Sequence, residues 1–202
     1  MRGDTYWHWT PCHRKATIDC MTELTKTAVE SPPRPGVAEL VERIRPRAQQ
    51  QADARTIAQQ VADVLTEMLP GPELLTEAER AGSPEGYIRH TLHAEATFSL
   101  LAVVWRPGQV TEIHDHLVWC SFKVLQGTET ETLYGFDGDR LVEIGQRQRP
   151  PGSVSGAAPP DDIHRVRNTD DTVAITLHVY GADLSNGTSV RRTYPQPEDS
   201  VS

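Results

Sequence analysis

The hydrophobic pattern of this chain changes period near residue 86, and this change limits the folds that the chain can adopt. Up to that point apolar residues recur with helical spacing, in one stripe from Val37 to Ile44 and another from Ile57 to Met68. A shorter helix is predicted over 72–81. Beyond it the apolar residues come in short β-rich runs separated by turn signals. Helices followed by many short strands predict a mainly β fold, a sandwich or barrel of antiparallel strands with helices over one face.

The predicted strands differ in how their apolar residues are spaced. TFSLLAVVW (97–105) is apolar throughout, whereas ETETLYGF (129–136) alternates and ends at the turn signal Asp137-Gly138. The remaining segments that we predict as strands are 119–125, 139–144, 151–155, 163–168, 172–180 and 188–194. We therefore expect a disordered tail over 1–35, a single domain over 36–195 with helices in 36–82 and a β-barrel in 86–195, and a loose tail over 196–202.

The composition excludes several classes of protein. Twenty basic residues against 28 acidic ones give a net charge of −8, which disfavours a nucleic acid held by phosphate contacts. No run approaches the ~18 apolar residues of a membrane-spanning helix. Three cysteines, an odd number, form no disulfide framework. We expect a cytoplasmic monomer with no nucleic-acid or membrane partner. A zinc site near the N-terminus is the weaker alternative, because its four candidate ligands match no standard finger spacing: His8, Cys12, His13 and Cys20.

Six of the eight histidines lie in the β-rich part of the chain, and two of them are separated by one residue. In His114-Asp115-His116 the two imidazoles point to the same face of a strand, while Asp115 points to the other. Neutral imidazole is the most common metal ligand in proteins. His164, on another predicted strand, is the candidate third ligand. Glu112 shares the face of the histidine pair and would make a site with four ligands.

The surroundings of these histidines follow a known pattern. From Gly108 to Gly127 the chain reads G-x5-H-x-H-x3-C-x6-G, which resembles the first cupin motif with Cys120 in place of the usual Glu. His164 and Asn168 resemble the H-x3-N end of the second cupin motif, although Pro159-Pro160 stands where that motif has Pro-Gly. This resemblance implies the cupin double-stranded β-helix, a jelly-roll barrel.

The missing Glu changes the chemistry expected at such a site. Three neutral imidazoles leave a divalent metal with its full charge, and a thiol bound to such an ion is deprotonated. A carboxylate ligand would neutralise part of that charge. We therefore expect a site suited to thiolate chemistry, with Fe(II) as the metal best suited to O₂.

A cupin with three histidines and Cys in place of Glu, followed by a T-x-H-x-Y strand, resembles the cysteine dioxygenase type I family of bacterial thiol dioxygenases. That strand is Thr176–Tyr180 here, and YIRH (87–90) resembles the family's substrate-binding segment. The resemblance covers 87–194, about half of the chain. It implies an oxidoreductase of cysteine catabolism that oxidises L-cysteine to cysteine sulfinate with both atoms of O₂.

The resemblance also implies a role for each candidate residue. His114, His116 and His164 hold Fe(II). Catalytic roles fall to Tyr180, which offers a hydroxyl, to His178, which orients it, and to Cys120. The substrate is bound by Arg89, which grips its carboxylate, and by Tyr87, and Thr176 lies behind His178.

Several alternatives stay open at this point. Cys120 and Tyr180 either form a thioether crosslink, as some relatives do, or remain separate. A 3-mercaptopropionate dioxygenase is the closest rival, and Arg89 favours cysteine over it. A non-catalytic cupin that binds a metal or small molecule is a second rival, and a cupin isomerase that uses another metal is a third.

Overall fold

The computed structural model describes residues 34–160 and 162–197, so the candidate zinc ligands between His8 and Cys20 lie outside the described residues. Two amphipathic helices come first, α1 (Val37–Ala48) and α2 (Ala54–Glu67). Each buries the apolar stripe that its sequence predicts, from Val37 to Ile44 in α1 and from Ile57 to Leu65 in α2. Among the described residues, no helix is both long and apolar enough to cross a membrane.

The helix predicted over 72–81 is divided in the structure. A 3₁₀ turn covers Pro72–Leu74, and a separate short helix, α3, covers Glu77–Arg80. Thr76 separates them because its side chain accepts a hydrogen bond from the Glu79 N–H, while the Glu79 carboxylate accepts one from the Thr76 N–H. This capping box starts a new helix at a residue that the apolar pattern alone reads as helix interior.

In the part of the chain that the structure describes, ten strands follow and form two five-stranded antiparallel sheets. One has the order β1-β2-β9-β4-β7 and the other β10-β3-β8-β5-β6. The bounds are β1 Ile88–Glu95, β2 Phe98–Trp105, β3 Ile113–His116, β4 Cys120–Gln126, β5 Glu129–Asp137, β6 Arg140–Arg149, β7 Val154–Ala157, β8 His164–Asn168, β9 Ala174–Tyr180 and β10 Val190–Tyr194. This arrangement confirms the predicted jelly-roll of the cupin fold.

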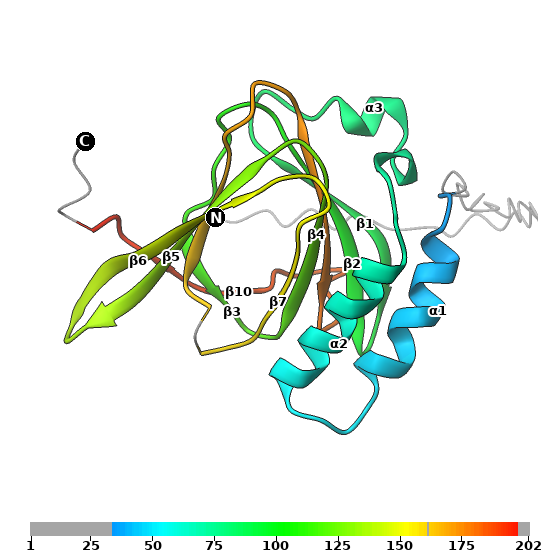
Figure 1. Ribbon diagram of the computed structural model, residues 1–202, viewed down its shortest axis with the longest axis horizontal. Helices are drawn as coiled ribbons and strands as arrows, with labels where there is room; N and C mark the ends of the chain where they lie inside the picture. The colour runs from blue at the N-terminus through cyan, green and yellow to red at the C-terminus, as the bar shows by residue number, and fades with distance from the viewer. Residues whose placement is uncertain (1–33, 161, 198–202) are drawn as a thin grey trace, which may run out of the picture. The chain divides into compact units, whose positions relative to one another are not determined.

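The helices cover only one of the two sheets. In Figure 1, α1 and α2 lie beside β1, β2, β4 and β7, and they pack against these strands. Strand β2 is buried on both faces. Its even-numbered residues, from Phe98 to Val104, join the core with the helices, whereas Val103 and Trp105 pack inward against Val166 and Ala174. Burial on both sides explains why this strand is apolar throughout rather than alternating.

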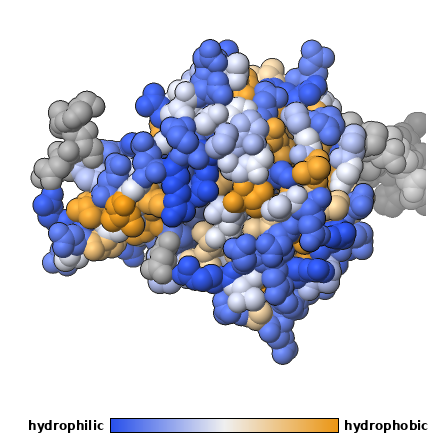
Figure 2. All heavy atoms as spheres, viewed as in Figure 1, coloured by the Kyte–Doolittle hydropathy of each residue, from blue (hydrophilic) through white to orange (hydrophobic). Residues whose placement is uncertain are grey.

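Strands β1 and β6 depart furthest from the sequence prediction. Strand β1 is absent from the predicted segments because its sequence, IRHTLHAE, carries few apolar residues. Strand β6 extends to Arg149 rather than 144 and forms a hairpin with β5 that projects from the sheets in Figure 1. The hairpin leaves Phe136 and Ile144 exposed, and hydrophobic atoms gather over the same region in Figure 2.

Candidate metal centre

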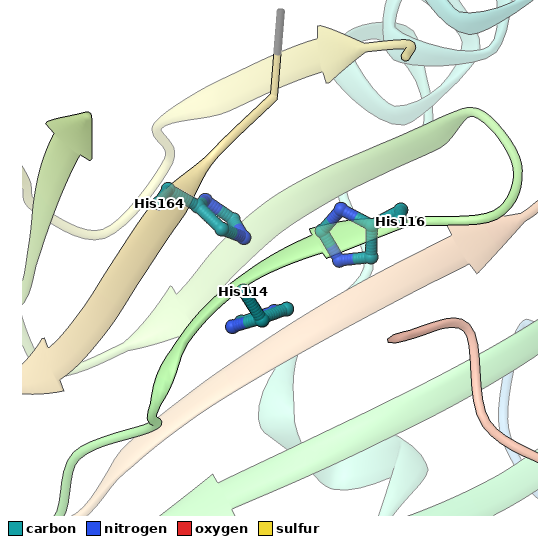
Figure 3. A group of neighbouring side chains, drawn as sticks. All are labelled: His114, His116 and His164. Atoms are coloured by element: carbon teal, nitrogen blue, oxygen red, sulfur yellow. The ribbon is translucent and has the colours of Figure 1, made fainter. Parts of the chain in front are cut away.

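Three histidines from two neighbouring strands converge in the second sheet. His114 and His116 lie on β3, and His164 lies on β8 directly opposite His114 in the strand register. Their candidate ligand atoms all lie within 4.8 Å of one another. Figure 3 shows the three rings pointing toward a common centre. The i, i+2 spacing of His114 and His116 places both rings on one face, as the sequence predicts.

Each of the three rings is held by a hydrogen bond at its Nδ1 atom. His114 Nδ1 lies 2.9 Å from the backbone oxygen of Glu112, His116 Nδ1 lies 3.1 Å from Asp162, and His164 Nδ1 lies 3.0 Å from Glu131. A carbonyl and an ionised carboxylate only accept hydrogen bonds, so all three Nδ1 atoms carry the proton. The lone pair of each ring is therefore on Nε2, the state that a metal ligand needs.

Burial favours the neutral form of His114 and His116. It lowers the pKa of His114 to about 3 and also lowers the pKa of His116, in each case because a charged ring would lose its hydration. Rings with free Nε2 lone pairs fit a divalent metal ion. The Glu112 side chain is exposed and is not part of the three-histidine group, so the structure gives no support to a fourth, carboxylate ligand.

Two buried carboxylates behind the histidines were missed by the sequence analysis. Asp162 accepts hydrogen bonds from both the backbone N–H and Nδ1 of His116. Glu131 accepts from His164 Nδ1 and pairs with Arg149 at 2.6 Å. Burial alone would raise the pKa of Glu131, but the hydrogen bond from His164 and the Arg149 guanidinium lower it to about 2. The signal was present in the alternating T-E-T-E-T of β5, which turns both glutamates to one face.

The other sheet contributes the T-x-H-x-Y strand. On β9 the His178 Nε2 atom lies 3.1 Å from the Thr176 hydroxyl, and the Tyr180 hydroxyl lies 3.3 Å from His178 Nδ1. The Tyr180 ring also contacts the His116 ring, with centroids 5.7 Å apart. The strand therefore places the Tyr180 ring beside one of the candidate ligands.

Cys120 lies directly opposite Tyr180 in the register of β4 and β9. Its Sγ atom is 3.8 Å from His178 Nδ1, and burial raises the pKa of its thiol. The chain leaves β3 after His116 and enters the opposite sheet at Cys120. The pairing of Cys120 with Tyr180 therefore comes from sheet topology.

Thr176 has two further partners that the sequence analysis did not assign. The Trp105 indole N–H donates to its hydroxyl at 3.0 Å, and the hydroxyl lies 3.0 Å from Glu129 Oε1. Glu129 is 2 % exposed. Its burial raises the pKa of its carboxyl to about 8, against the opposing effect of the Thr176 hydrogen bond. Trp105 therefore both packs in the core and joins the polar network through its indole N–H.

A cavity of about 280 Å³ joins these groups. The three histidines, Cys120, His178 and Tyr180 line it, and so do Arg89, Tyr87 and Glu129. Arg89 is exposed on β1, and the Tyr87 ring lies 4.4 Å from the Trp105 ring, centroid to centroid. Of the nine site residues that the sequence predicts, eight line this one cavity, and Thr176 lies behind it.

The chain is similar to curated cysteine dioxygenases over part of its length. Cysteine dioxygenase type 1 of Danio rerio is 34% identical over 90 residues, and that of Homo sapiens is 32% identical over 88 residues. Each alignment covers 41% of this chain and 44% of the relative, so the match spans less than half of the length of these relatives.

A solved structure of a sugar phosphate isomerase from a cupin superfamily, from Silicibacter pomeroyi, is 21% identical with a TM-score of 0.40 and covers 55% of this chain and 65% of its own. The model of the family described as cysteine dioxygenase type I matches residues 76–191, which is more than half of the chain. The histidine group, the T-x-H-x-Y strand and every residue that lines the cavity except Arg55 lie within the matched residues. This chain belongs to the cysteine dioxygenase type I family.

Proposed function

We propose that this protein is an iron-dependent thiol dioxygenase whose substrate is L-cysteine, oxidised to cysteine sulfinate with both atoms of O₂. The observation that carries the proposal is the composition of the cavity. It combines three histidines without a carboxylate ligand, the Tyr180 ring beside one of them, and Arg89, for which the described residues offer no carboxylate partner. Family membership supports the same class of reaction.

The ferrous ion would be held by the Nε2 atoms of His114, His116 and His164, because their Nδ1 atoms already form hydrogen bonds. When bound, iron would supply a redox-active centre at which a thiolate and O₂ react. The residues behind the histidines fix their orientation, because each ring has one acceptor that sets its tautomer and direction.

Arg89 would bind the substrate carboxylate. A guanidinium is always charged and forms two parallel hydrogen bonds to a carboxylate. Hydrogen bonds to charged groups are worth about 1.5–3 kcal/mol, which is roughly one to two decades of affinity. Tyr87 lines the same part of the cavity and would contact the polar end of the substrate.

Tyr180 would offer its hydroxyl to the substrate or to oxygen, held in place by His178 and, through it, by Thr176. Cys120 keeps its proton because burial raises the pKa of its thiol, so it does not compete with the substrate thiolate for the metal. Its position opposite Tyr180 supports a thioether between the two residues. Peptide mapping after turnover tests this crosslink, and unmodified Cys120 and Tyr180 peptides would exclude it.

The decisive experiment is anaerobic loading with Fe(II), followed by O₂ uptake with cysteine, 3-mercaptopropionate and cysteamine. Cysteine carries both an amine and a carboxylate, 3-mercaptopropionate carries only the carboxylate, and cysteamine carries only the amine. We expect cysteine to be preferred by more than about tenfold. The variant Arg89→Gln should weaken cysteine use by about 10- to 100-fold with unchanged iron content, since one carboxylate clamp is lost. Arg167→Gln is the matched control, because Arg167 is exposed on β8 and does not line the cavity.

Each failure has a distinct meaning. Preference for 3-mercaptopropionate would move the substrate to the rival branch and leave the reaction class intact. No O₂ uptake with any thiol, in a protein that binds iron, would overturn the proposed function and favour a binding module. An Arg89→Gln variant with unchanged kinetics would remove Arg89 from the substrate site.

A further inference from the structure

The Thr176 hydroxyl is a junction with three neighbours. Trp105 Nε1 and Glu129 Oε1 each lie 3.0 Å from its oxygen, and His178 Nε2 lies 3.1 Å from it. A hydroxyl has one proton to donate and two lone pairs to accept with. An indole nitrogen only donates, so the Trp105 N–H occupies one lone pair of the Thr176 oxygen in every arrangement. One proton and one lone pair remain for Glu129 and His178, and these two residues must therefore take opposite roles.

This count allows two arrangements. If Glu129 is a carboxylate, Thr176 donates to it, His178 Nε2–H donates to Thr176, and His178 Nδ1 is bare. The Tyr180 hydroxyl, 3.3 Å from that nitrogen, then donates to it. If Glu129 is a carboxylic acid that donates to Thr176, then Thr176 donates to His178 Nε2 and the ring proton lies on Nδ1. Tyr180 then accepts from His178, and its own proton no longer goes to His178. The other side-chain partners of the Tyr180 hydroxyl are Cys120 and Ser189.

We propose that Glu129 is the terminal member of a proton chain, Glu129–Thr176–His178–Tyr180, and that its protonation state selects the tautomer of His178 and the direction of the hydrogen bond at Tyr180. Glu129 acts through Thr176 and His178, so it is a positioning residue. The inference rests on the proposed function in one respect only, namely that the Tyr180 proton released from His178 serves the oxidation of the thiol.

The two arrangements differ by one proton. In going from the first to the second, the Tyr180 proton moves to His178 Nδ1, the Nε2 proton moves to Thr176, and the Thr176 proton moves to Glu129 Oε1. The Tyr180 oxygen takes a replacement proton from the cavity, which both end residues line. Every O–H and N–H bond broken is matched by one formed, and no oxidant or reductant is required.

The surroundings of Glu129 decide which arrangement is present. On its own strand the nearest charged group is Glu131, whose carboxylate disfavours a second negative charge. Arg149 on β6 favours a negative charge on Glu129, but its guanidinium already forms an ion pair with Glu131. From β9 Glu129 faces the Thr176 hydroxyl with His178 behind it. Burial dominates and raises the pKa of Glu129 to about 8, so the acid form prevails at neutral pH.

The test reads the tautomer of His178 directly in metal-free protein. In protein labelled with ¹⁵N-histidine, the chemical shift of each ring nitrogen shows whether that nitrogen is protonated, and the His178→Gln spectrum identifies the His178 signals. We expect the proton to move from Nδ1 to Nε2 as pH rises from about 6 to about 10, with a midpoint near 8. A single tautomer over the whole range would overturn the inference.

Three variants separate the proton chain from general effects on structure. Glu129→Gln keeps the shape but does not titrate, so the transition should vanish. Thr176→Val breaks the chain and should also abolish it, whereas Thr176→Ser should retain it. Glu143→Gln, at an exposed carboxylate on β6, is the matched control and should leave the midpoint unchanged. A transition that persists in Glu129→Gln with the original midpoint contradicts the proposal, and so does one that persists in Thr176→Val.

The outcome is independent of the proposed function. A His178 transition in a protein whose iron-loaded form oxidises no thiol supports the proton chain and overturns the dioxygenase assignment. An active dioxygenase without the transition overturns the proton chain alone. In an active enzyme with the transition, oxygen uptake should fall through the same midpoint in the wild type, and this fall should be absent in Glu129→Gln.

Discussion

Glu129 and Glu131 are two residues apart on β5, are both buried and line the same cavity, yet their carboxyl groups have opposite properties. The pKa of Glu131 is lowered to about 2, whereas that of Glu129 is raised to about 8. Burial acts in the same direction on both. The difference is that Glu131 has a histidine N–H and an arginine as partners, while Glu129 has only a hydroxyl. Partners, more than depth, decide which buried acid is charged.

This contrast divides the cavity into two halves. Glu131 supplies a fixed negative charge behind His164 on the sheet that carries the histidines. Glu129 supplies a neutral acid to Thr176 on the opposite sheet. One half of the cavity is therefore suited to holding a cation, and the other to moving protons.

The largest effect is expected from removing the charged acid. Glu131→Leu leaves the mostly buried Arg149 guanidinium unpaired and frees the His164 ring. We expect the free energy of unfolding to fall by about 3 kcal/mol, as when one partner of a buried ion pair is lost. Iron affinity should fall by about 10- to 100-fold, because the orientation of His164 is lost. Urea unfolding and equilibrium Fe(II) titration measure the two effects.

Glu112→Gln is the control for that comparison. The Glu112 side chain is exposed and only its backbone oxygen contacts His114, so iron affinity should stay at the wild-type value. A strong loss of iron in Glu112→Gln would revive the four-ligand site, and unchanged iron affinity in Glu131→Leu would remove Glu131 from the metal centre.

The neutral acid should be visible in the pH dependence of stability. The folded-state pKa of Glu129 is raised from 4.5 to about 8, so its contribution to stability is fully present below pH 4.5 and is lost as pH rises toward 8. Each pKa unit corresponds to about 1.4 kcal/mol. Between acidic and alkaline pH the wild type should therefore lose about 5 kcal/mol relative to Glu129→Gln, measured by urea unfolding at each pH. Parallel stability curves for the two proteins would show that folding does not raise the pKa of Glu129.

The smallest effect is expected from a change that keeps the charge. Arg149 pairs with Glu131 through two nitrogens, and its guanidinium lies over the Phe122 ring. Arg149→Lys retains the cation but loses the planar contact with both groups. Stability should fall by about 1 kcal/mol and iron affinity by only a few-fold, while the His178 transition keeps its midpoint. A loss as large as that of Glu131→Leu would mean that the shape of the pair matters more than its charge.

The sequence predicts the fold class and the main elements because periodicity reports burial on one face. It predicts the stripes of α1 and α2 and most of the strands, and the H-x-H spacing predicts that His114 and His116 share a face. It fails where polar capping overrides the apolar pattern, as at Thr76, and where a strand lacks apolar residues, as in β1.

The acids around the site could not be predicted because their roles depend on contacts between distant strands. Glu131 meets His164 across the β5–β8 pair, and Asp162 meets His116 from the segment before β8. Glu129 reaches Thr176 in the other sheet. Spacing along one strand shows which face a side chain takes, but it does not show which residue of the facing sheet it meets.

The placement of the histidines and the T-x-H-x-Y strand on separate sheets has a consequence for how this scaffold can diversify. Retention of the proposed metal would depend on hydrogen bonds within one sheet, whereas the proposed control of the His178 tautomer would depend on residues that approach from β5 and β2. Substitutions at Glu129 or Trp105 would therefore change proton positions in the cavity and leave the three-histidine group unchanged.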